Sequence, residues 1–314
     1  MNDTRASGKP GIVVAPFTDD GILRAVEEGG GRLVEAPQAE AVVWTDPGNP
    51  ESLGKLLEES SARWVQLPLA GLERFFASGV IDSSRVWTCA KGIYGYACAE
   101  HAVALTLAAA RVIHTHARDR SWRPPGFQSP HRLLRGSTVL IVGTGGIGSA
   151  TVPLLQPFGV RILAVNRSGR PMQGAERTVA HTGLAEVVSE ADFTVLAAPL
   201  TASTAGMFDR SLMARMKPAA WLINVARGGL IVTGDLVAAL EEGSIGGAAL
   251  DVTDPEPLPD GHPLWGLDNA IITPHIANTI SMSLPQLRDL VRRNVRKYAA
   301  GESLEGLVDP ALGY

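Results

Sequence analysis

Residues 137–148 read Ser-Thr-Val-Leu-Ile-Val-Gly-Thr-Gly-Gly-Ile-Gly, and this stretch decides the fold. An apolar, β-branched run enters the spacing Gly-x-Gly-x-x-Gly directly, which predicts a strand, a tight turn and a helix that binds a dinucleotide. The first glycine permits the turn, the second lets the backbone approach a pyrophosphate, and the last allows close packing of helix on strand. The residues expected to hold the cofactor here are Gly143, Gly145, Gly146, Ile147 and Gly148.

The pyrophosphate is expected at the N-terminus of this helix, where free N–H groups and the helix dipole favour anions. A glycine-rich loop that binds nothing is the alternative, and the preceding strand argues against it. Pro153 and Pro157 lie inside the expected helix. Because proline removes a helical donor and crowds the preceding turn, we expect a short or kinked helix.

The turn after the next predicted strand, 161–165, indicates which dinucleotide is bound. An acidic residue about 20 positions after the glycines would hold the ribose 2′-hydroxyl of NAD, but this chain has none there. Two guanidinium groups and a hydroxyl suit a 2′-phosphate. We therefore predict NADP(H) in preference to NAD(H), with a solvated basic loop as the alternative. The predicted contacts are Asn166, Arg167, Ser168 and Arg170.

Composition narrows the class of protein further. The chain has 314 residues, 45% hydrophobic and 19% charged, with 28 Lys+Arg against 32 Asp+Glu and a net charge of −4. This excludes intrinsic disorder and predicts about two domains. The slight acidity argues against a nucleic-acid partner. No apolar run reaches the roughly 20 residues of a membrane helix, and the N-terminus lacks a signal-peptide pattern.

The cysteines and the strand pattern complete this picture. Cys89 and Cys98 fit neither a disulfide framework nor a metal or redox motif, so we expect a cytoplasmic protein. Short apolar runs alternate with helical patterns, which is typical of parallel α/β layers. Helices are expected over 100–118 and 284–300. Strands are expected at 11–15, 41–44, 64–67, 137–142, 161–165, 193–197, 221–225, 248–252 and 270–273.

Three polar residues follow the predicted strands of the second series: Arg227, Glu256 and His275. Ligands of open parallel sheets bind outside the carboxyl ends of the strands, so these side chains are expected to converge beside the glycine turn. An arginine, a carboxylate and an imidazole next to a nicotinamide suit carbonyl reduction. Taken singly, each is equally well explained as a capping, loop or surface residue. His114 and His116 are two apart on a predicted helix and make a poor metal pair, and no metal is predicted.

The sequence resembles the D-2-hydroxyacid dehydrogenase family over most of its length. The matching stretches are AEHAVALTLAAAR at 99–111, VGTGGIGS at 142–149, APLTAST at 198–204, INVARGGLIV at 223–232, ALDVTDPEPLP at 249–259 and ITPHIAN at 272–278. The resemblance implies that His275 is the acid/base, that Glu256 hydrogen-bonds to it, and that Arg227 binds and polarises a 2-oxo acid.

The resemblance also implies further contacts. Asp251 is expected to contact the nicotinamide carboxamide, and Pro199, Thr204 and Val225 are expected beside the cofactor. His275, Arg227 and the backbone at Ala70 and Gly71 are expected to hold the substrate.

The fold implied is a Rossmann-type parallel-sheet cofactor domain, residues 100–283, inserted in a smaller flavodoxin-like α/β substrate domain, residues 1–99 and 284–314. A homodimer is implied, with helix 100–118 contributing. Glyoxylate and hydroxypyruvate are the expected substrates. Residues 91–96, Lys-Gly-Ile-Tyr-Gly-Tyr, depart from common members, so the roles of Tyr94 and Tyr96 stay open. A phosphite-type dehydrogenase and a corepressor-like dinucleotide-binding protein are the alternatives.

Overall fold

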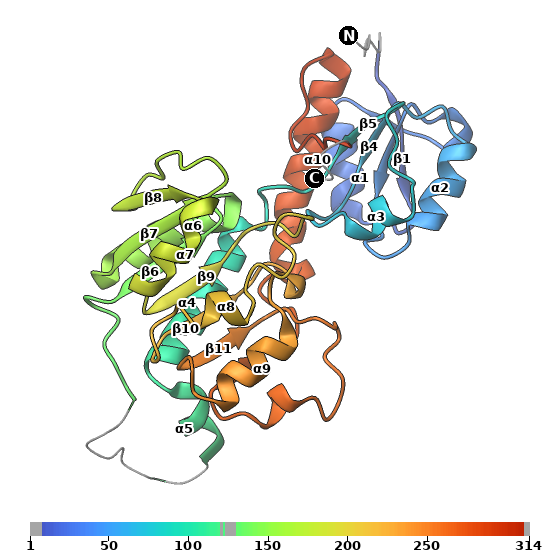
Figure 1. Cartoon of the computed structure of the whole chain (residues 1–314). Helices are drawn as coiled ribbons and strands as arrows, with labels where there is room; N and C mark the ends of the chain where they lie inside the picture. The colour runs from blue at the N-terminus through green and yellow to red at the C-terminus, as the bar shows by residue number, and fades with distance from the viewer. Residues whose placement is uncertain (1–7, 120–121, 123–129, 311–314) are drawn as a thin grey trace. The chain divides into compact units, whose positions relative to one another are not determined.

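The structure is a computed structural model that describes residues 8–119, 122 and 130–310. The chain divides into two compact units (Figure 1). Unit 1 comprises Met1–Tyr94 and Ile280–Tyr314, and unit 2 comprises Gly95–Thr279. Unit 2 is thus inserted in the sequence of unit 1, with boundaries close to those predicted after residues 99 and 283.

The described part of unit 1 contains a five-stranded parallel sheet in the order β2-β1-β3-β4-β5. This order is flavodoxin-like, as predicted. The short strands β2 and β5 were not predicted. The strands are β1 (Gly11–Ala15), β2 (Arg32–Leu33), β3 (Ala41–Trp44), β4 (Trp64–Gln66) and β5 (Val86–Thr88).

Helices cover both faces of this sheet. Successive strand residues point to opposite faces, so Ile12 packs against α1 (Asp20–Glu28) and α10 (Ile280–Ala300). Val13 packs on the other side, against α2 (Pro50–Glu58) and α3 (Glu73–Ala77). The last helix therefore returns to the first unit, as the pattern over 284–300 suggests, and it begins earlier, at Ile280.

The described part of unit 2 contains a seven-stranded parallel sheet in the order β12-β11-β10-β9-β6-β7-β8. This is the Rossmann order extended by one strand, and the strand order reverses between β6 and β9. The strands are β6 (Thr138–Val142), β7 (Arg161–Asn166), β8 (Arg177–Ala180), β9 (Phe193–Leu196), β10 (Trp221–Asn224), β11 (Gly247–Leu250) and β12 (Ala270–Ile272). The fold prediction is confirmed, with β8 as an edge strand that was not predicted.

Two helical layers enclose this sheet. Val139 and Ile141 of β6 face α4 (Gly95–Ala110) and α6 (Gly146–Leu155). Leu140 and Val142 face the opposite layer, which contains α7 (Leu184–Val187), α8 (Arg210–Met213) and α9 (Thr233–Glu241). Both faces of the strands are buried, which explains their nearly continuous apolar sequences.

The single helix predicted over 100–118 is wrong. The chain forms α4 and then α5 (Ile113–Asp119), which are bent by 68° at the break between them. Val112 lies in the break with φ +53°, a left-handed conformation that is rare for a β-branched residue. Neither glycine nor proline marks this position, so the sequence pattern did not show the break.

The helix after the glycine turn is short, as predicted. Pro153 lies in α6, which ends at Leu155, and Pro157 lies in the 3₁₀ turn Gln156–Phe158 that follows. Gly159 then takes a left-handed φ of +69° and ends the turn.

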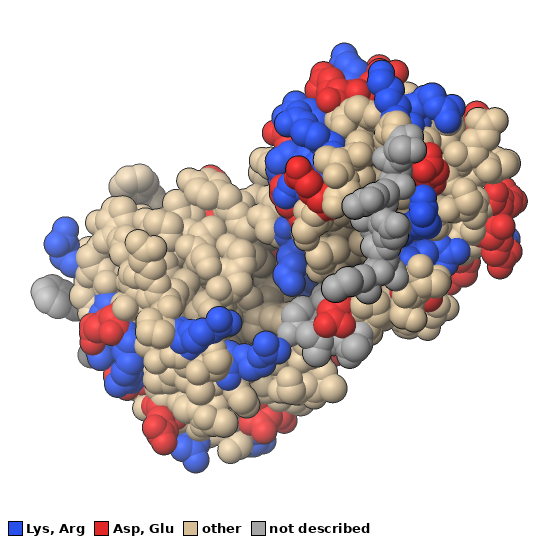
Figure 2. Space-filling view, turned by 90° about the horizontal axis from the view of Figure 1, so that it is seen from above, with Lys and Arg blue, Asp and Glu red and all other residues tan. Residues whose placement is uncertain are grey.

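In the described part of the chain no single helix is long and apolar enough to cross a membrane; only the bent pair α4 and α5 together reaches that length and hydropathy. On the face in Figure 2, Lys and Arg side chains are interspersed with Asp and Glu. The absence of a nucleic-acid partner stays a prediction.

Candidate active site

The glycine turn lies at the carboxyl end of β6, where the strand order of unit 2 reverses. Gly143 has φ +102°, and a Cβ there would lie 2.6 Å from the Ala197 backbone after β9. A Cβ on Gly148 would lie 2.0 Å from the Gly143 carbonyl oxygen. Both positions therefore require glycine, one for conformation and approach to β9, the other for close packing of α6.

Gly145 differs from these two glycines, because no atom lies within 4 Å of the position its Cβ would take. It is the N-cap of α6, and no side chain caps the helix there. The first turn of α6, which begins at Gly146 and Ile147, also carries no acidic residue. The open backbone and uncapped N–H groups suit a pyrophosphate.

The turn after β7 is held together by Asn166. Its Oδ1 accepts hydrogen bonds from the Ser168 and Gly169 amides at 3.1 and 2.7 Å, and its Nδ2 donates to the Arg170 carbonyl oxygen at 2.8 Å. The same Nδ2 donates to Thr144 Oγ1 of the glycine turn at 3.2 Å. Asn166 thus joins the two segments in which the cofactor contacts were predicted.

The basic side chains of this turn lie at its surface. Arg170 Nε donates to Ser168 Oγ at 3.2 Å, and His181 Nδ1 lies 3.2 Å from the Arg167 carbonyl oxygen. No carboxylate side chain occupies residues 166–170. The turn therefore presents guanidinium and hydroxyl groups without the negative charge that would repel a phosphate.

The loop after β9 contains Pro199 and Thr204. Thr204 Oγ1 donates to the Pro199 carbonyl oxygen at 2.7 Å and accepts from the Thr201 amide at 2.8 Å. This hydroxyl therefore stabilises the loop from within. Pro199 is exposed, whereas Val225, directly after β10, is buried against the α4 layer. The expected cofactor contacts of these residues stay predictions.

Arg227 follows β10 in a loop packed tightly on the loop after β11. A Cβ on Gly228 would lie 1.9 Å from the Thr253 carbonyl oxygen, so only glycine fits between these loops. Arg227 is half-buried, its Nη1 donates to the Ala226 carbonyl oxygen at 2.7 Å, and its own carbonyl oxygen accepts from Asn224 Nδ2 at 2.8 Å. The packing brings the Arg227 loop against the segment that leads to Glu256.

His275 and Glu256 form the pair that the sequence predicted. His275 Nδ1 lies 2.6 Å from Glu256 Oε1, which is a short hydrogen bond. The side chains are 51% and 41% exposed, so the ring reaches solvent while its Nδ1 is held. His275 has φ +53°, a left-handed conformation that is uncommon for a non-glycine residue.

Asp251 lies beneath this pair and is 1% exposed. Its Oδ1 accepts from Thr273 Oγ1 at 2.6 Å and from the Ile276 amide at 2.9 Å, and its Oδ2 accepts from the Ala277 amide at 2.9 Å. Burial by itself would raise the pKa of this carboxyl. The hydrogen bonds from His101, Thr273 and the two amides outweigh burial and lower the pKa of Asp251 to about 2.

His101 of α4 completes the cluster, and the sequence analysis missed it. Its Nε2 lies 3.0 Å from Thr273 Oγ1 and 3.4 Å from Asp251 Oδ1. A histidine within an Ala/Leu-rich helix gives no strand-end signal, so only the packing of α4 on the sheet reveals the contact. Cys98, one turn earlier, is also buried. Burial and Asp251 raise the pKa of its thiol to about 11, against the opposing effect of Arg227.

The expected substrate contacts Ala70 and Gly71 lie in unit 1, in the loop between β4 and α3, where Ala70 is exposed. Their contact with substrate stays a prediction. Tyr94, also in unit 1, donates a hydrogen bond to the Pro68 carbonyl oxygen. Tyr96 begins α4 in unit 2 and is 62% exposed.

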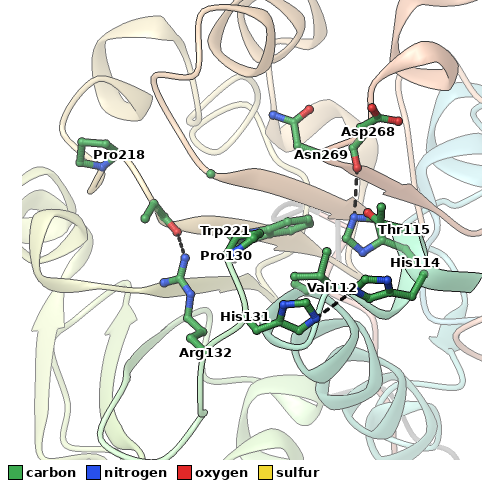
Figure 3. Close-up of a pocket in the computed structure, with 14 residues that line it drawn as sticks. Val112, His114, Thr115, Pro130, His131, Arg132, Pro218, Trp221, Asp268 and Asn269 are labelled. Carbon is green, nitrogen blue, oxygen red and sulfur yellow. Dashed lines mark hydrogen bonds between the residues drawn. The ribbon is translucent and has the colours of Figure 1, made fainter. Parts of the chain in front are cut away.

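A cavity of about 650 Å³ lies at the opposite edge of the unit 2 sheet (Figure 3). Trp221 and Asn269, at or beside the amino ends of β10 and β12, line it together with Arg132. His116 Nε2 and His131 Nε2 lie 3.0 Å apart at its rim. Because ligands of such sheets bind at the carboxyl ends, this cavity is separate from the candidate active site. Among the described residues no three His, Cys, Asp or Glu side chains are placed to hold a metal ion.

Comparisons with known proteins agree with this geometry. The chain is 42% identical over 297 residues to an uncharacterized protein of Corynebacterium melassecola, covering 92% of this chain and 95% of that one. It is 36% identical over 226 residues to a glyoxylate reductase of Thermofilum pendens, covering 69% and 66% of the two chains.

Solved structures share the fold. A glyoxylate/hydroxypyruvate reductase of Sinorhizobium meliloti, described as NADPH-dependent and solved with NADP and sulfate, superposes with a TM-score of 0.80 at 24% identity. The alignment covers 98% of this chain and all of the other. The fold is therefore shared over both units.

The family model of the NAD-binding domain of D-isomer specific 2-hydroxyacid dehydrogenases matches residues 103–277. That match lies within unit 2 and contains the glycine turn, Arg227, Asp251, Glu256 and His275. Unit 2 is thus a nicotinamide-dinucleotide-binding domain, and the chain belongs to the D-isomer specific 2-hydroxyacid dehydrogenase family of oxidoreductases.

Proposed function

We propose that the protein reduces a small 2-oxo acid to the D-2-hydroxy acid with NADPH, and that glyoxylate and hydroxypyruvate are its substrates. The observation that carries this proposal is the 2.6 Å contact between His275 Nδ1 and Glu256 Oε1 at the carboxyl edge of a dinucleotide-binding sheet. A positioned imidazole at this edge is what proton transfer to a carbonyl oxygen requires. The glyoxylate reductase relative supports the choice of substrate.

The proton comes from His275 in this proposal. Glu256 accepts the Nδ1 proton, which leaves Nε2 as the atom that donates to the substrate oxygen. The carboxylate of Glu256 also holds the ring in one orientation through this hydrogen bond. A bound reduced nicotinamide supplies hydride to carbon 2, so that the carbonyl gains one hydride and one proton.

Arg227 binds the substrate anion and stabilises negative charge that develops on the carbonyl oxygen. The close packing of Gly228 on Thr253 and the hydrogen bond from Asn224 hold the backbone of its loop in place. The guanidinium is therefore attached to a fixed backbone. We assign the substrate carboxylate to the backbone at Ala70 and Gly71 as well, and the nicotinamide carboxamide to Asp251.

The preference for NADPH rests on the turn after β7. Arg167, Ser168 and Arg170 present cationic and hydroxyl groups, and Asn166 fixes the turn to the glycine loop. The Sinorhizobium relative in the fold comparison is described as NADPH-dependent, which supports the same choice. In this proposal the cofactor also contacts Pro199, Thr204 and Val225.

The deciding experiment follows the oxidation of NADPH and of NADH with glyoxylate, hydroxypyruvate, pyruvate and larger 2-oxo acids. We expect turnover with a clear NADPH preference, and a loss of that preference in Arg167→Ala/Arg170→Ala. A preference for NADH in the wild-type protein would overturn the cofactor assignment. Phosphite offered with oxidised cofactor tests the phosphite alternative, and tight cofactor binding without any turnover would favour the corepressor alternative.

Two variants test the proton donor. His275→Ala should reduce kcat by at least about a thousandfold and leave NADPH affinity within about threefold, since general acid catalysis contributes 10²–10⁴-fold. Glu256→Gln should lower kcat, because a neutral amide does not stabilise the imidazolium that donates the proton. His262→Ala, in a loop of the same unit, serves as the control. Near-native rates in His275→Ala would exclude this residue as the donor.

We further propose a homodimer formed through α4 and α5. Tyr96, Glu100 and Ala104 lie on one exposed face of α4, and Ile113 of α5 is 53% exposed. Light scattering after size exclusion should give a dimer for the wild-type protein and a monomer for Ala104→Arg. A monomeric wild-type protein would contradict the proposal.

A further inference from the structure

The hydrogen bonds around Thr273 determine which ring nitrogen of His101 carries a proton. Asp251 is an ionised carboxylate that accepts only, so Thr273 Oγ1, at 2.6 Å from it, must donate its single proton to Asp251. Thr273 Oγ1 is therefore an acceptor toward His101 Nε2 at 3.0 Å. His101 must carry a proton on Nε2, where it also faces Asp251 Oδ1 at 3.4 Å.

The same cluster holds the backbone of His275. The His275 amide donates to the Asp251 carbonyl oxygen at 2.8 Å and to the Thr273 carbonyl oxygen at 3.0 Å. The next two amides, of Ile276 and Ala277, donate to the Asp251 carboxylate. These bonds oppose the relaxation of His275 from φ +53°, a conformation that costs free energy in a residue with a Cβ.

We propose that His101 is a positioning residue for His275, acting through Thr273 and Asp251. A donor on α4 fixes the Thr273 hydroxyl, and the hydroxyl orients the Asp251 carboxylate. The carboxylate in turn holds the two amides that directly follow His275. The inference rests on the proposed function for its kinetic consequence, and its geometry is independent of that function.

A direct role for His101 in proton transfer does not fit the burial of the two histidines. The His101 side chain is 19% exposed and its Nε2 is committed to Thr273 and Asp251, whereas the His275 side chain is 51% exposed. The Cys98 thiol of α4 lies close enough to Asp251 and to Arg227 for both charges to affect its pKa.

Four variants separate positioning from simple packing. His101→Leu removes the donor and His101→Gln replaces it with an amide N–H of similar reach. Thr273→Val removes the hydroxyl that joins His101 to Asp251. Thr106→Val is the matched control, because Thr106 is a buried residue of the same helix whose Oγ1 donates only to the Ala102 carbonyl oxygen at 2.7 Å.

The expected kinetic result is a fall in kcat of about tenfold in His101→Leu and in Thr273→Val, because misplacement of an acid by less than 1 Å costs one to two orders of magnitude. His101→Gln should restore most of kcat, and the His101→Leu/Thr273→Val double variant should be no slower than Thr273→Val alone. A kcat within twofold of wild type in His101→Leu, or no recovery of kcat in His101→Gln, would overturn the proposal. So would a double variant whose loss of kcat equals the product of the losses in the two single variants.

A spectroscopic readout does not depend on turnover. In protein labelled with ¹⁵N-histidine, long-range ¹H–¹⁵N spectra should show His101 protonated on Nε2. The ring signals of His275 should shift in Thr273→Val and stay in place in Thr106→Val. An Nδ1-protonated His101, or unchanged His275 signals in Thr273→Val, would overturn the proposal. If the wild-type protein reduced no 2-oxo acid, the proposed function would be wrong. The NMR spectra would still test whether His101 positions His275 through Thr273 and Asp251.

Discussion

In each unit a strand leads directly into a helix, but the N-terminus of that helix is capped by a carboxylate in unit 1 and is uncapped in unit 2. In unit 1, β1 leads to α1, whose N-cap Asp19 accepts from the Ile22 amide at 2.8 Å. Arg288 of α10 donates to both carboxylate oxygens of Asp19, at 2.9 and 2.8 Å. In unit 2, β6 leads to α6, whose N-cap Gly145 has no side chain to offer.

This difference indicates which helix N-terminus is open to an anion. The α1 terminus is occupied by its own carboxylate, and Gly21 has no side chain, which leaves room for Arg288 to reach that carboxylate. The α6 terminus has no cap and no acid in its first turn. The proposed position of the pyrophosphate thus rests on unsatisfied N–H groups and not on the α/β fold as such.

The largest effect, on NADPH affinity, is expected when an acidic N-cap like that of α1 is introduced at the N-terminus of α6. Gly145→Asp should weaken NADPH binding by at least about a hundredfold, because its carboxylate caps the N–H groups and repels the pyrophosphate. The fold should persist, since no atom lies within 4 Å of the new Cβ. Calorimetric titration with NADPH measures the effect.

Gly145→Ala is the matched control and should bind within about tenfold of wild type. An aspartate variant that bound NADPH as well as the alanine variant would show that the open terminus of α6 is not the pyrophosphate site.

The second prediction contrasts Asp251 with Asp19, two carboxylates that accept backbone amides. The pKa of Asp251 falls from the usual 3.8 to about 2, which corresponds to about 2 kcal/mol of stability at neutral pH. Because its pKa is lowered on folding, this stability is present above pH 3.8 and is lost as pH falls through about 2. Asp251→Asn should therefore be less stable by about 2 kcal/mol at pH 7.

Urea unfolding of both proteins at a series of pH values checks this prediction. The difference in the free energy of unfolding between wild type and Asp251→Asn should become smaller as pH falls below 3.8. A difference that is constant down to pH 2 would mean that the loss comes from packing and not from the charge.

The third prediction concerns the turn after β7, which bonds to the glycine turn through Asn166. Asn166→Asp keeps an acceptor for the Ser168 and Gly169 amides and adds a negative charge. NADPH affinity should fall by about tenfold, with NADH affinity changed by less than about threefold, because the charge repels only a 2′-phosphate. Asn269→Asp, at the opposite edge of the sheet, is the control. Equal losses for both cofactors would place the 2′-position elsewhere.

The smallest effect is expected at the capped terminus of unit 1. Asp19→Ala removes an N-cap and should cost about 1 kcal/mol of stability, with NADPH affinity unchanged. The hydrogen bond from Arg288 lowers the pKa of Asp19, so its contribution is lost in acid. Asp289→Ala, which breaks an exposed ion pair with Arg292, should cost less. A loss of NADPH binding in Asp19→Ala would contradict the division of roles between the two helix termini.

The parts of the site that lie at strand ends were predictable from sequence. The carboxyl ends of parallel strands share one edge, so Glu256 and His275 could be paired once their strands were recognised. The glycine turn was predictable because its spacing directly follows an apolar strand and precedes a helix. The break at Val112 was not predictable, since no glycine or proline marks it and a β-branched residue rarely adopts a left-handed conformation.

The sequence by itself determined the parallel α/β class, the dinucleotide turn, the absence of an acid after β7 and the positions of Glu256 and His275 after strand ends. These features follow from periodicity and from residues whose chemistry acts within a few positions of a strand end. Only the tertiary structure decided that His101 reaches Thr273 and Asp251, and that Asp251 holds the segment beginning at His275. The physical reason is that His101 lies more than a hundred positions from Thr273 and Asp251 in the chain. Asp251 and the segment that it binds follow different strands, so these distances exist only after α4 and the strands have packed together.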